Sequence, residues 1–231
     1  MIAFIAAEIR EFIGLRRHLK NEHNLVLKSQ WAVCGELNGR DVVLTANGPG
    51  PELASRAAQA VEENRRLNAL VSYGFCGALD PALHINDILI GSEVQCGAGI
   101  LACHLPKQQA GMPPARRLLS TDRVVTTAQE KAALRKSGAA AVEMEAAGVA
   151  AYAQAQNIPF YCIRVVTDTA NEDLPIDFNV VRDSEGRFSR FKIMAQAARN
   201  PLKLVPALLA LNKRANAAAH HLGDFVATCE F

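Results

Sequence analysis

The sequence predicts an α/β fold in which a sheet with parallel strands is covered by helices on both faces. Short, nearly continuous apolar runs, of which residues 160–167 are the clearest, alternate along the chain with longer amphipathic segments. Hydrophobic residues make up 50% of the 231 and charged residues 21%, so the chain can bury a core, and wholesale disorder is excluded. No internal repeat or low-complexity tract interrupts this alternation.

The elements can be placed in chain order. The expected strands are residues 2–6, 31–37, 40–46, 70–73, 87–94 and 160–167. The expected helices are residues 8–20, 51–66, 128–136 and 142–156, and two more between 188 and 222 that divide near Asn200-Pro201. The pair Asn38-Gly39 predicts a tight hairpin turn between two of the strands, and Pro51 suits the first turn of its helix.

Two segments break the alternation. Residues 95–117 are rich in Gly, Pro and Gln, and we expect a long loop there. Residues 170–187 contain Pro175 and the turn 183–186, which predict a mobile flap. We expect residues 1–187 to form the catalytic domain and residues 188–231 to form a C-terminal helical extension packed on that same domain.

Charge and cysteine content limit the functional classes. A formal net charge of +2 with scattered Lys and Arg argues against nucleic acid as a partner. The first apolar run ends at Glu8 and is too short for a signal peptide or a bilayer span, which predicts a cytoplasmic protein. The six cysteines lack CxxC spacing, and Cys103-His104 near Cys96 lacks a second ligand pair, so we expect no metal.

Ligands of open α/β sheets bind beyond the carboxyl ends of the strands, so the residues that follow each expected strand are candidates. They are Glu8 and Glu11, the turn Asn47-Gly48-Pro49-Gly50, the turn Gly74-Phe75-Cys76-Gly77, and Thr167 with Asp168. The segment Gly48-Pro49-Gly50 lacks the third glycine of a dinucleotide fingerprint. It favours a tight loop at which a ligand, including an anion, approaches the backbone at Gly48 and Gly50.

Four acidic residues carry the candidate chemistry. Asp168 ends an apolar run, and two interpretations stay open: a helix cap or strand-end contact with solvent, or a partly buried carboxyl with a raised pKa that serves as a general acid. Glu143 and Glu145 lie two residues apart in an expected helix, so they point to different faces and one can face a cleft. Glu11 taken alone is typical of a surface residue.

Taken together, these segments resemble the purine nucleoside phosphorylase and methylthioadenosine/S-adenosylhomocysteine nucleosidase superfamily. The resemblance covers residues 1–171 in order, and its most specific parts are Val142-Glu143-Met144-Glu145-Ala146 and residues 164–170. It implies a three-layer αβα fold with a mixed central sheet and cleavage of a nucleoside's N-glycosidic bond. It also implies water or inorganic phosphate as co-substrate, no cofactor, and a homodimer.

The resemblance also implies roles for individual residues. An Asp at the position of Asp168 protonates the departing purine with Thr167 beside it, and a Glu at the position of Glu145 accepts hydrogen bonds from the ribose hydroxyls. Val125 stands near the position where the family places an aromatic ring that stacks on the base. The other substrate-binding residues that the resemblance implies are Phe75, Cys76, Gly77, Glu143 and Met144.

The same resemblance bears on whether water or phosphate is the co-substrate. Where the phosphorylases bind phosphate with an Arg and a Ser, this chain has Ser72 and Phe75, while Glu11 matches the acid that activates water in the nucleosidases. We therefore expect hydrolysis of a 5′-substituted adenosine, methylthioadenosine-like or adenosylhopane-like, with release of adenine. A phosphorylase with a rebuilt phosphate site stays open. So does a non-catalytic nucleoside- or lipid-binding protein, because the bulky Phe75 would narrow a ribose site.

The C-terminal part resembles the hopanoid-associated branch of the superfamily. Residues 202–211 place Leu and Val side chains on one helix, with Lys203 and Lys213 beside them. Such a helix packs on the domain or on a twin subunit, or it contacts a membrane surface or a lipid substrate.

Overall fold

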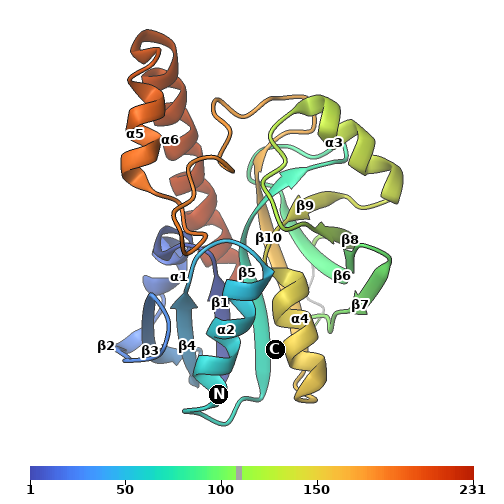
Figure 1. The fold of residues 1–231 in the computed structure, drawn as a ribbon. Coiled ribbons are helices and arrows are strands. Elements are labelled where there is room, and N and C mark those ends of the chain that lie inside the picture. Colours follow the sequence, from blue (N-terminus) through green and yellow to red (C-terminus); the bar gives the residue numbers. More distant parts are fainter. Residues whose placement is uncertain (108–110) are drawn as a thin grey trace.

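The computed structural model describes residues 1–107 and 111–231 and contains one mixed sheet between two layers of helices (Figure 1). The strands are β1 (Ile2–Ala6), β2 (Lys20–Asn24), β3 (Trp31–Leu37), β4 (Arg40–Ala46), β5 (Ala69–Ala78), β6 (Ile88–Cys96), β7 (Gly99–Ala102), β8 (Ala115–Ser120), β9 (Ala141–Glu143) and β10 (Phe160–Asp168). The helices are η1 (Ile9–Phe12), α1 (Ile13–Arg16), α2 (Pro51–Glu62), α3 (Ala128–Leu134), η2 (Arg135–Ser137), α4 (Ala146–Ala155), α5 (Arg190–Ala197) and α6 (Pro201–Val226).

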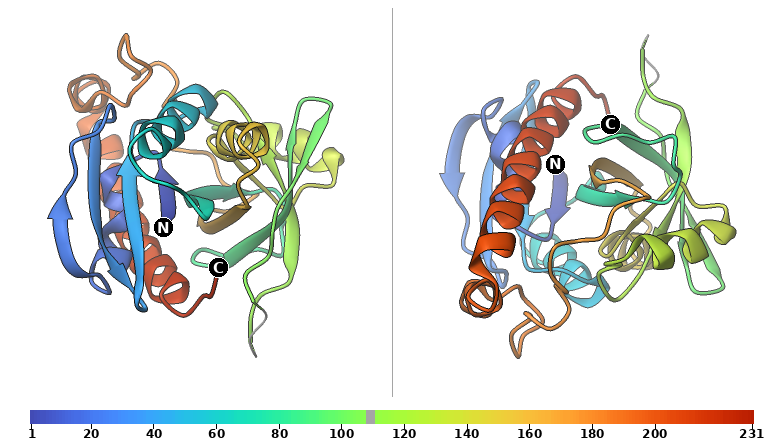
Figure 2. Two further views of the ribbon diagram at one scale, coloured as in Figure 1. Left: turned by 90° about the horizontal axis from the view of Figure 1, so that it is seen from below. Right: turned by 90° about the horizontal axis from the view of Figure 1, so that it is seen from above.

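The sheet separates two hydrophobic cores. Helices α2 and α4 cover one face, and α1 with the C-terminal half of α6 covers the other (Figures 1 and 2). Strand β1 serves both cores, because Ala3 and Ile5 face the first and Phe4 and Ala6 face the second. This arrangement is the three-layer αβα fold with a mixed central sheet that the family resemblance implies.

Strand β5 brings the ends of three strands together. It pairs in parallel with β1 and β10, and its last residues pair antiparallel with β9. Gly77 consequently lies opposite Asp168 of β10 on one side and Val142 of β9 on the other. The carboxyl ends of β5 and β10 therefore meet the end of β9, which carries the first of the two glutamates.

The hairpin prediction is confirmed, since β3 and β4 pair antiparallel around Asn38 and Gly39, both of which have positive φ.

The expected helix 8–20 is wrong beyond its first turns. Only η1 and α1 are helical, and residues 20–24 form the exposed edge strand β2 on β3. Strand β2 is polar throughout. It therefore lacks the alternation of apolar and polar residues by which a strand is recognised in a sequence.

The prediction places the start of the helix 142–156 too early in the sequence. Residues 141–143 form β9, because they pair with β5 and β8, and α4 starts only at Ala146. The expectation that Glu143 and Glu145 project from two faces of one helix is therefore wrong. Glu143 ends a strand, and Glu145 is the N-cap residue of α4.

The expected long loop 95–117 is also partly wrong. Strand β6 runs to Cys96 and turns back as β7, and β8 begins at Ala115. Residues 108–110 of that segment lie outside the described residues. The segment 170–187 forms no helix, and an isolated bridge joins Arg182 to Phe188. Its mobility stays a prediction.

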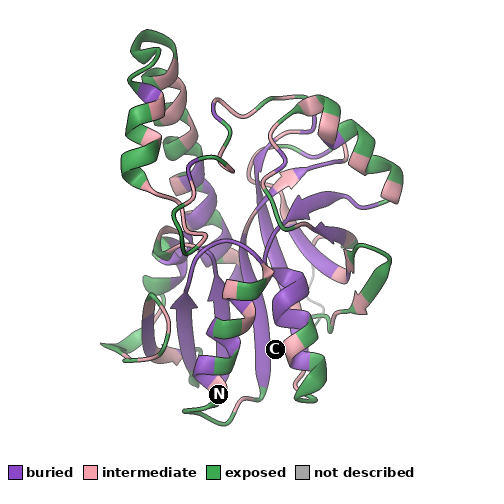
Figure 3. Cartoon of the chain, in the orientation of Figure 1, coloured by how far each residue is buried: buried purple, intermediate pink, exposed green. Residues whose placement is uncertain are grey.

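The C-terminal helices divide at Asn200-Pro201, as predicted. The C-terminal half of α6 contributes Ala218, Leu222 and Val226 to the second core, whereas α5 and the first turns of α6 project from the body of the molecule (Figure 3). The domain boundary at residue 187 stays a prediction, although half of α6 belongs to the common core. In the described part of the chain, no helix combines the length and apolarity needed to cross a membrane.

Candidate active site

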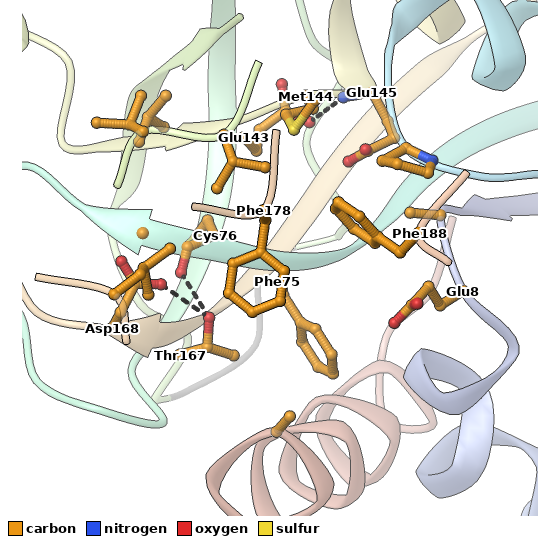
Figure 4. Close-up of a pocket in the computed structure, with 18 of the residues that line it drawn as sticks. Glu8, Phe75, Cys76, Glu143, Met144, Glu145, Thr167, Asp168, Phe178 and Phe188 are labelled. Carbon is orange, nitrogen blue, oxygen red and sulfur yellow. Dashed lines mark hydrogen bonds between the residues drawn. The ribbon is translucent and has the colours of Figure 1, made fainter. Parts of the chain in front are cut away.

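A pocket opens where the carboxyl ends of β5, β9 and β10 meet the residues after β1 (Figure 4). Its outer wall comes from the segment after β10 and from Leu211 and Ala215 of α6. It brings together every residue predicted to be catalytic or to bind substrate: Glu11, Phe75, Cys76, Gly77, Val125, Glu143, Met144, Glu145, Thr167 and Asp168. Pro49 also lines it, while Gly48 and Gly50 do not, although the backbone of Gly50 reaches Glu145.

Asp168 is a buried carboxyl in the wall of this pocket. It is 7% exposed, and its Oδ1 accepts a hydrogen bond from the Thr167 hydroxyl at 3.1 Å. Burial raises the pKa of Asp168, and the ammonium of Lys131, 2.6 Å from Oδ2, opposes that rise. Of the two interpretations that the sequence leaves open, the structure favours the buried acid over a solvent contact at a strand end.

Lys131 is a neighbour of Asp168 that the sequence does not reveal. Its side chain in α3 is fully buried, and besides Asp168 it donates hydrogen bonds to the carbonyls of Thr169 and Glu172, at 2.7 and 3.1 Å. The surrounding sequence, with Glu130 before it and Arg135 after it, is typical of an exposed helix. Only the packing of the segment after β10 against α3 buries this lysine.

Glu11 is buried too, contrary to the expectation for this residue alone. It is 3% exposed, and its two carboxylate oxygens accept hydrogen bonds from the backbone N–H groups of Glu8, at 2.7 Å, and Phe75, at 2.9 Å. Burial raises the pKa of Glu11. Gly74 makes this contact possible, because its φ is +148° and a Cβ there would overlap the Glu11 carboxylate.

Glu145 faces the pocket from the start of α4. Its Oε1 accepts a hydrogen bond from the backbone N–H of Gly50 at 3.1 Å, and the Arg164 guanidinium lies 3.6 Å from Oε2. Burial raises the pKa of Glu145 to about 8 although Arg164 opposes the rise. The predicted loop at Gly48 and Gly50 thus holds one of the chain's own carboxyls through Gly50.

Glu143 positions its neighbour. Its Oε2 accepts hydrogen bonds from the backbone N–H groups of Glu145, at 2.9 Å, and Ala146, at 2.8 Å, and so caps the start of α4. The same oxygen is ion-paired with Arg164, which is fully buried and also donates to the Ser72 hydroxyl at 2.7 Å. Arg164 therefore holds both glutamates from behind the pocket wall.

The two ends of the pocket differ in chemistry. In Figure 4, Asp168 and Thr167 lie at one end and Glu145 at the other, with Phe75 and Phe178 between them. Phe188 closes the side near Glu145. The pocket therefore suits an elongated ligand with a basic heterocycle at one end, hydroxyl groups at the other and apolar surface along its side.

The described residues contain no group of three or more His, Cys, Asp or Glu side chains placed to hold a metal ion.

The chain is similar to known proteins over most of its length. The model of the phosphorylase superfamily matches residues 15–120 and 118–209. The 5′-methylthioadenosine/S-adenosylhomocysteine nucleosidase of Shewanella sediminis is 27% identical over 223 residues, which cover 84% of this chain and 97% of the relative. That of Shewanella baltica is 28% identical over 222 residues, which cover 84% of this chain and 94% of the relative.

Solved structures share the fold. The 5′-methylthioadenosine/S-adenosylhomocysteine nucleosidase from Neisseria meningitidis, in complex with methylthio-immucillin-A, has a TM-score of 0.70 at 22% identity and covers 98% of each chain. The futalosine hydrolase of Helicobacter pylori has a TM-score of 0.73 at 15% identity, covering 97% of this chain and 94% of its own. The predicted mixed α/β fold and superfamily are thereby confirmed, and the chain belongs to the phosphorylase superfamily.

Proposed function

We propose that the chain is a nucleosidase that hydrolyses the N-glycosidic bond of a 5′-substituted adenosine and releases adenine. The observation that carries the proposal is the presence of two buried carboxyls, Asp168 and Glu145, at opposite ends of one pocket. The similarity to the 5′-methylthioadenosine/S-adenosylhomocysteine nucleosidases supports the same substrate class.

Three of the four buried acids that line the pocket have a step in this reaction. Protonated Asp168 gives its proton to the purine as the N-glycosidic bond breaks. The electron pair of that bond leaves with the base. In its ionised form, which the Arg164 guanidinium favours, Glu145 accepts hydrogen bonds from the ribose hydroxyls and stabilises the positive charge that develops on the sugar. Glu11 accepts a proton from the water that attacks the anomeric carbon. The raised pKa of Asp168 suits a proton donor, and that of Glu11 suits a base.

The charges around the pocket favour water over phosphate. The arginines among the described lining residues, Arg10 and Arg123, are ion-paired with Glu8 and Glu130. Arg164 is fully buried and faces carboxylates. A phosphate dianion would therefore meet the acidic side chains of Glu11, Glu143, Glu145 and Asp168. Among the described residues, a cation beside the pocket without an ion pair is Arg182, whose guanidinium lies 3.5 Å from Met144 Sδ.

The apolar surfaces of the pocket support a substrate with an apolar 5′ group. Phe75, Phe178 and Phe188 line it together with Leu211 and Ala215 of α6. A methylthio-like or larger hydrocarbon substituent would bury apolar surface against these side chains.

The test is adenine release from methylthioadenosine and from adenosine, measured in phosphate-free buffer and again with phosphate. We expect release without phosphate, free reducing sugar as the second product and a faster reaction with methylthioadenosine. Strict phosphate dependence with a sugar-1-phosphate product would support the phosphorylase alternative instead. Stable binding of adenosine without turnover would support the non-catalytic alternative.

We also propose that α5 and the first half of α6, called the basic hairpin below, contact an anionic membrane surface. Phe191, Met194, Leu202 and Leu209 on it are 81%, 71%, 91% and 64% exposed. No Asp or Glu stands between Gly186 and Gly223, whereas Lys and Arg recur throughout. Exposed apolar side chains whose charged neighbours along the chain are all cations match the polarity and charge of an anionic lipid surface. Leu211 of the same helix α6 lines the pocket. Membrane contact through the basic hairpin would therefore place the mouth of the pocket near the lipid surface.

Sedimentation with lipid vesicles tests the membrane proposal. We expect binding to vesicles of phosphatidylcholine and phosphatidylglycerol, weaker binding to phosphatidylcholine alone, and loss of binding in Leu202→Asp. Exposed Asn212→Asp is the control for added charge on the same helix. If no vesicles bind while Leu202→Asp converts a dimer to a monomer in analytical ultracentrifugation, the basic hairpin is instead the interface of the expected homodimer.

The proposed reaction uses water as co-substrate and needs no cofactor. The cytoplasmic location that the sequence predicts stays a proposal.

A further inference from the structure

Lys131 is a buried cation in contact with the proposed acid, and the reaction described above leaves it without a role. It does not line the pocket, and its side chain reaches Asp168 from α3, behind the wall. Its ammonium lies 2.6 Å from Asp168 Oδ2 and donates to the carbonyls of Thr169, at 2.7 Å, and Glu172, at 3.1 Å. An ammonium has three N–H donors, so these three acceptors use all of them.

Placing a lysine here is costly for the fold, because a buried charge is tolerated only when it is paired and hydrogen-bonded. An apolar side chain in α3 would fill the same space without that cost. The contact with Asp168 points to a chemical reason. A carboxyl buried without a cation holds its proton too tightly to release it readily near neutral pH, and an adjacent ammonium favours the ionised form.

We propose that Lys131 is a positioning residue that stabilises the carboxylate left when Asp168 gives its proton to the departing purine. This inference rests on the proposed nucleosidase function. One proton moves from Asp168 to the base, and Lys131 keeps all of its protons throughout. Its two carbonyl contacts fix the ammonium in place, so the charge is already oriented before the proton leaves.

The other charged and titratable groups around Asp168 do not replace Lys131. Glu172, in the segment after β10, is an acid that raises the pKa of Asp168, and it is ion-paired with Arg214 of α6 at 2.9 Å. The thiol of Cys76 in β5 stays neutral because burial raises its pKa. Among the described residues, the cation that forms an ion pair with Asp168 is Lys131.

The test compares Lys131→Met with Lys136→Met, which removes a charge from an exposed position in the following turn η2. The kcat/KM for adenine release is measured against pH. The acid must be protonated, so the rate falls on the alkaline side near its pKa. Without the ammonium that pKa rises, so we expect the alkaline limb, the fall of kcat/KM at high pH, to move up by about one pH unit or more. We also expect kcat to fall about tenfold or more. Lys136→Met is expected to behave as wild type.

Two further measurements separate this role from a structural one. Hydrolysis of 4-nitrophenyl riboside needs no protonation of the leaving group, so we expect Lys131→Met to slow it far less than adenine release. Lys131→Gln keeps N–H donors for the carbonyls but lacks the charge, and it is expected to show the same limb shift even if Lys131→Met does not fold. Lys131→Arg keeps the charge and is expected to leave the limb in place.

The inference is overturned if neutral variants slow both substrates equally, or if their alkaline limb stays at the wild-type pH. A wild-type enzyme that releases no adenine would instead overturn the proposed function. The two failures are therefore distinguishable.

Discussion

Two glycines let buried carboxyls approach the backbone closely at the pocket. A Cβ on Gly74 would overlap Glu11, and a Cβ on Gly77 would lie 2.7 Å from Asp168 Oδ2. The sequence suggests that glycine turns at strand ends admit a ligand. The structure shows that these two glycines first admit the chain's own acids, which leaves the carboxyls buried and their pKa values raised.

Replacing Gly77 with Ala tests this arrangement. The added Cβ would displace the Asp168 carboxyl from its position, and we expect kcat for adenine release to fall more than tenfold with the fold retained. The measurement is steady-state kinetics alongside circular dichroism. Gly99→Ala is the control, because its Cβ would make only an ordinary contact, 3.5 Å from the Cys96 carbonyl. A Gly77→Ala enzyme with wild-type kcat would contradict the expectation.

Sequence motifs identify the residues on the pocket surface but not those behind it. Glu145 and Asp168 can be named because their segments resemble a known superfamily. Lys131 and Arg164 act from behind the wall. The sequence neighbours of Lys131 do not indicate its burial, because that burial results from contacts with segments distant in the chain. Arg164 stands in the apolar run 160–167, which indicates burial but not its distant partner Ser72.

At the scale of elements, local pattern predicts those whose shape is set locally. The hairpin at Asn38-Gly39 follows from backbone preferences of two residues. Strand β9 has only three residues and exists because β5 and β8 pair with it, which a local pattern cannot reveal. Strand β2 is likewise defined by its partner β3. The start of α4, and with it the direction of Glu145, depends on this non-local pairing.

Helix α6 is held to the body by a close crossing with α1. A Cβ on Gly223 would overlap the backbone of Gly14 and Leu15, and a Cβ on Gly14 would overlap the backbone of Ala219. We expect Gly223→Ala to lower the free energy of unfolding by about 1–3 kcal/mol, the usual cost of overpacking, as measured by urea denaturation. Asn212→Ala, on the exposed side of the same helix, is expected to change it by less than about 0.5 kcal/mol. Equal effects of the two substitutions would argue against a tight crossing.

For the whole molecule, the pocket joins parts that are distant in sequence. The strand ends supply the acids, while the segment after β10 and helix α6 supply the outer wall. Because the C-terminal half of α6 lies in the second core and its first half projects outward, one helix connects the core, the pocket and the basic hairpin. Placing acids in such an interior makes stability depend on pH.

The sign of that dependence follows from Glu145. Its carboxyl has an ordinary pKa of 4.5, and burial raises that pKa to about 8 in the folded protein. Between these values the folded state therefore holds a proton that the unfolded state has lost. Its contribution to stability is therefore full below pH 4.5 and is lost as pH rises toward 8. We expect urea denaturation to show a shallower fall of stability across this window in Glu145→Gln than in wild type. An unchanged slope in Glu145→Gln would contradict the raised pKa.

The central claim is that Asp168 gives a proton to the departing purine, and Asp168→Asn tests it most directly. Asparagine keeps the size of the side chain but has no acidic proton to transfer. We predict that kcat for adenine release falls by ~10²–10⁴, while the variant still binds a non-hydrolysable adenosine analogue with near wild-type affinity. Wild-type turnover by Asp168→Asn would contradict the account.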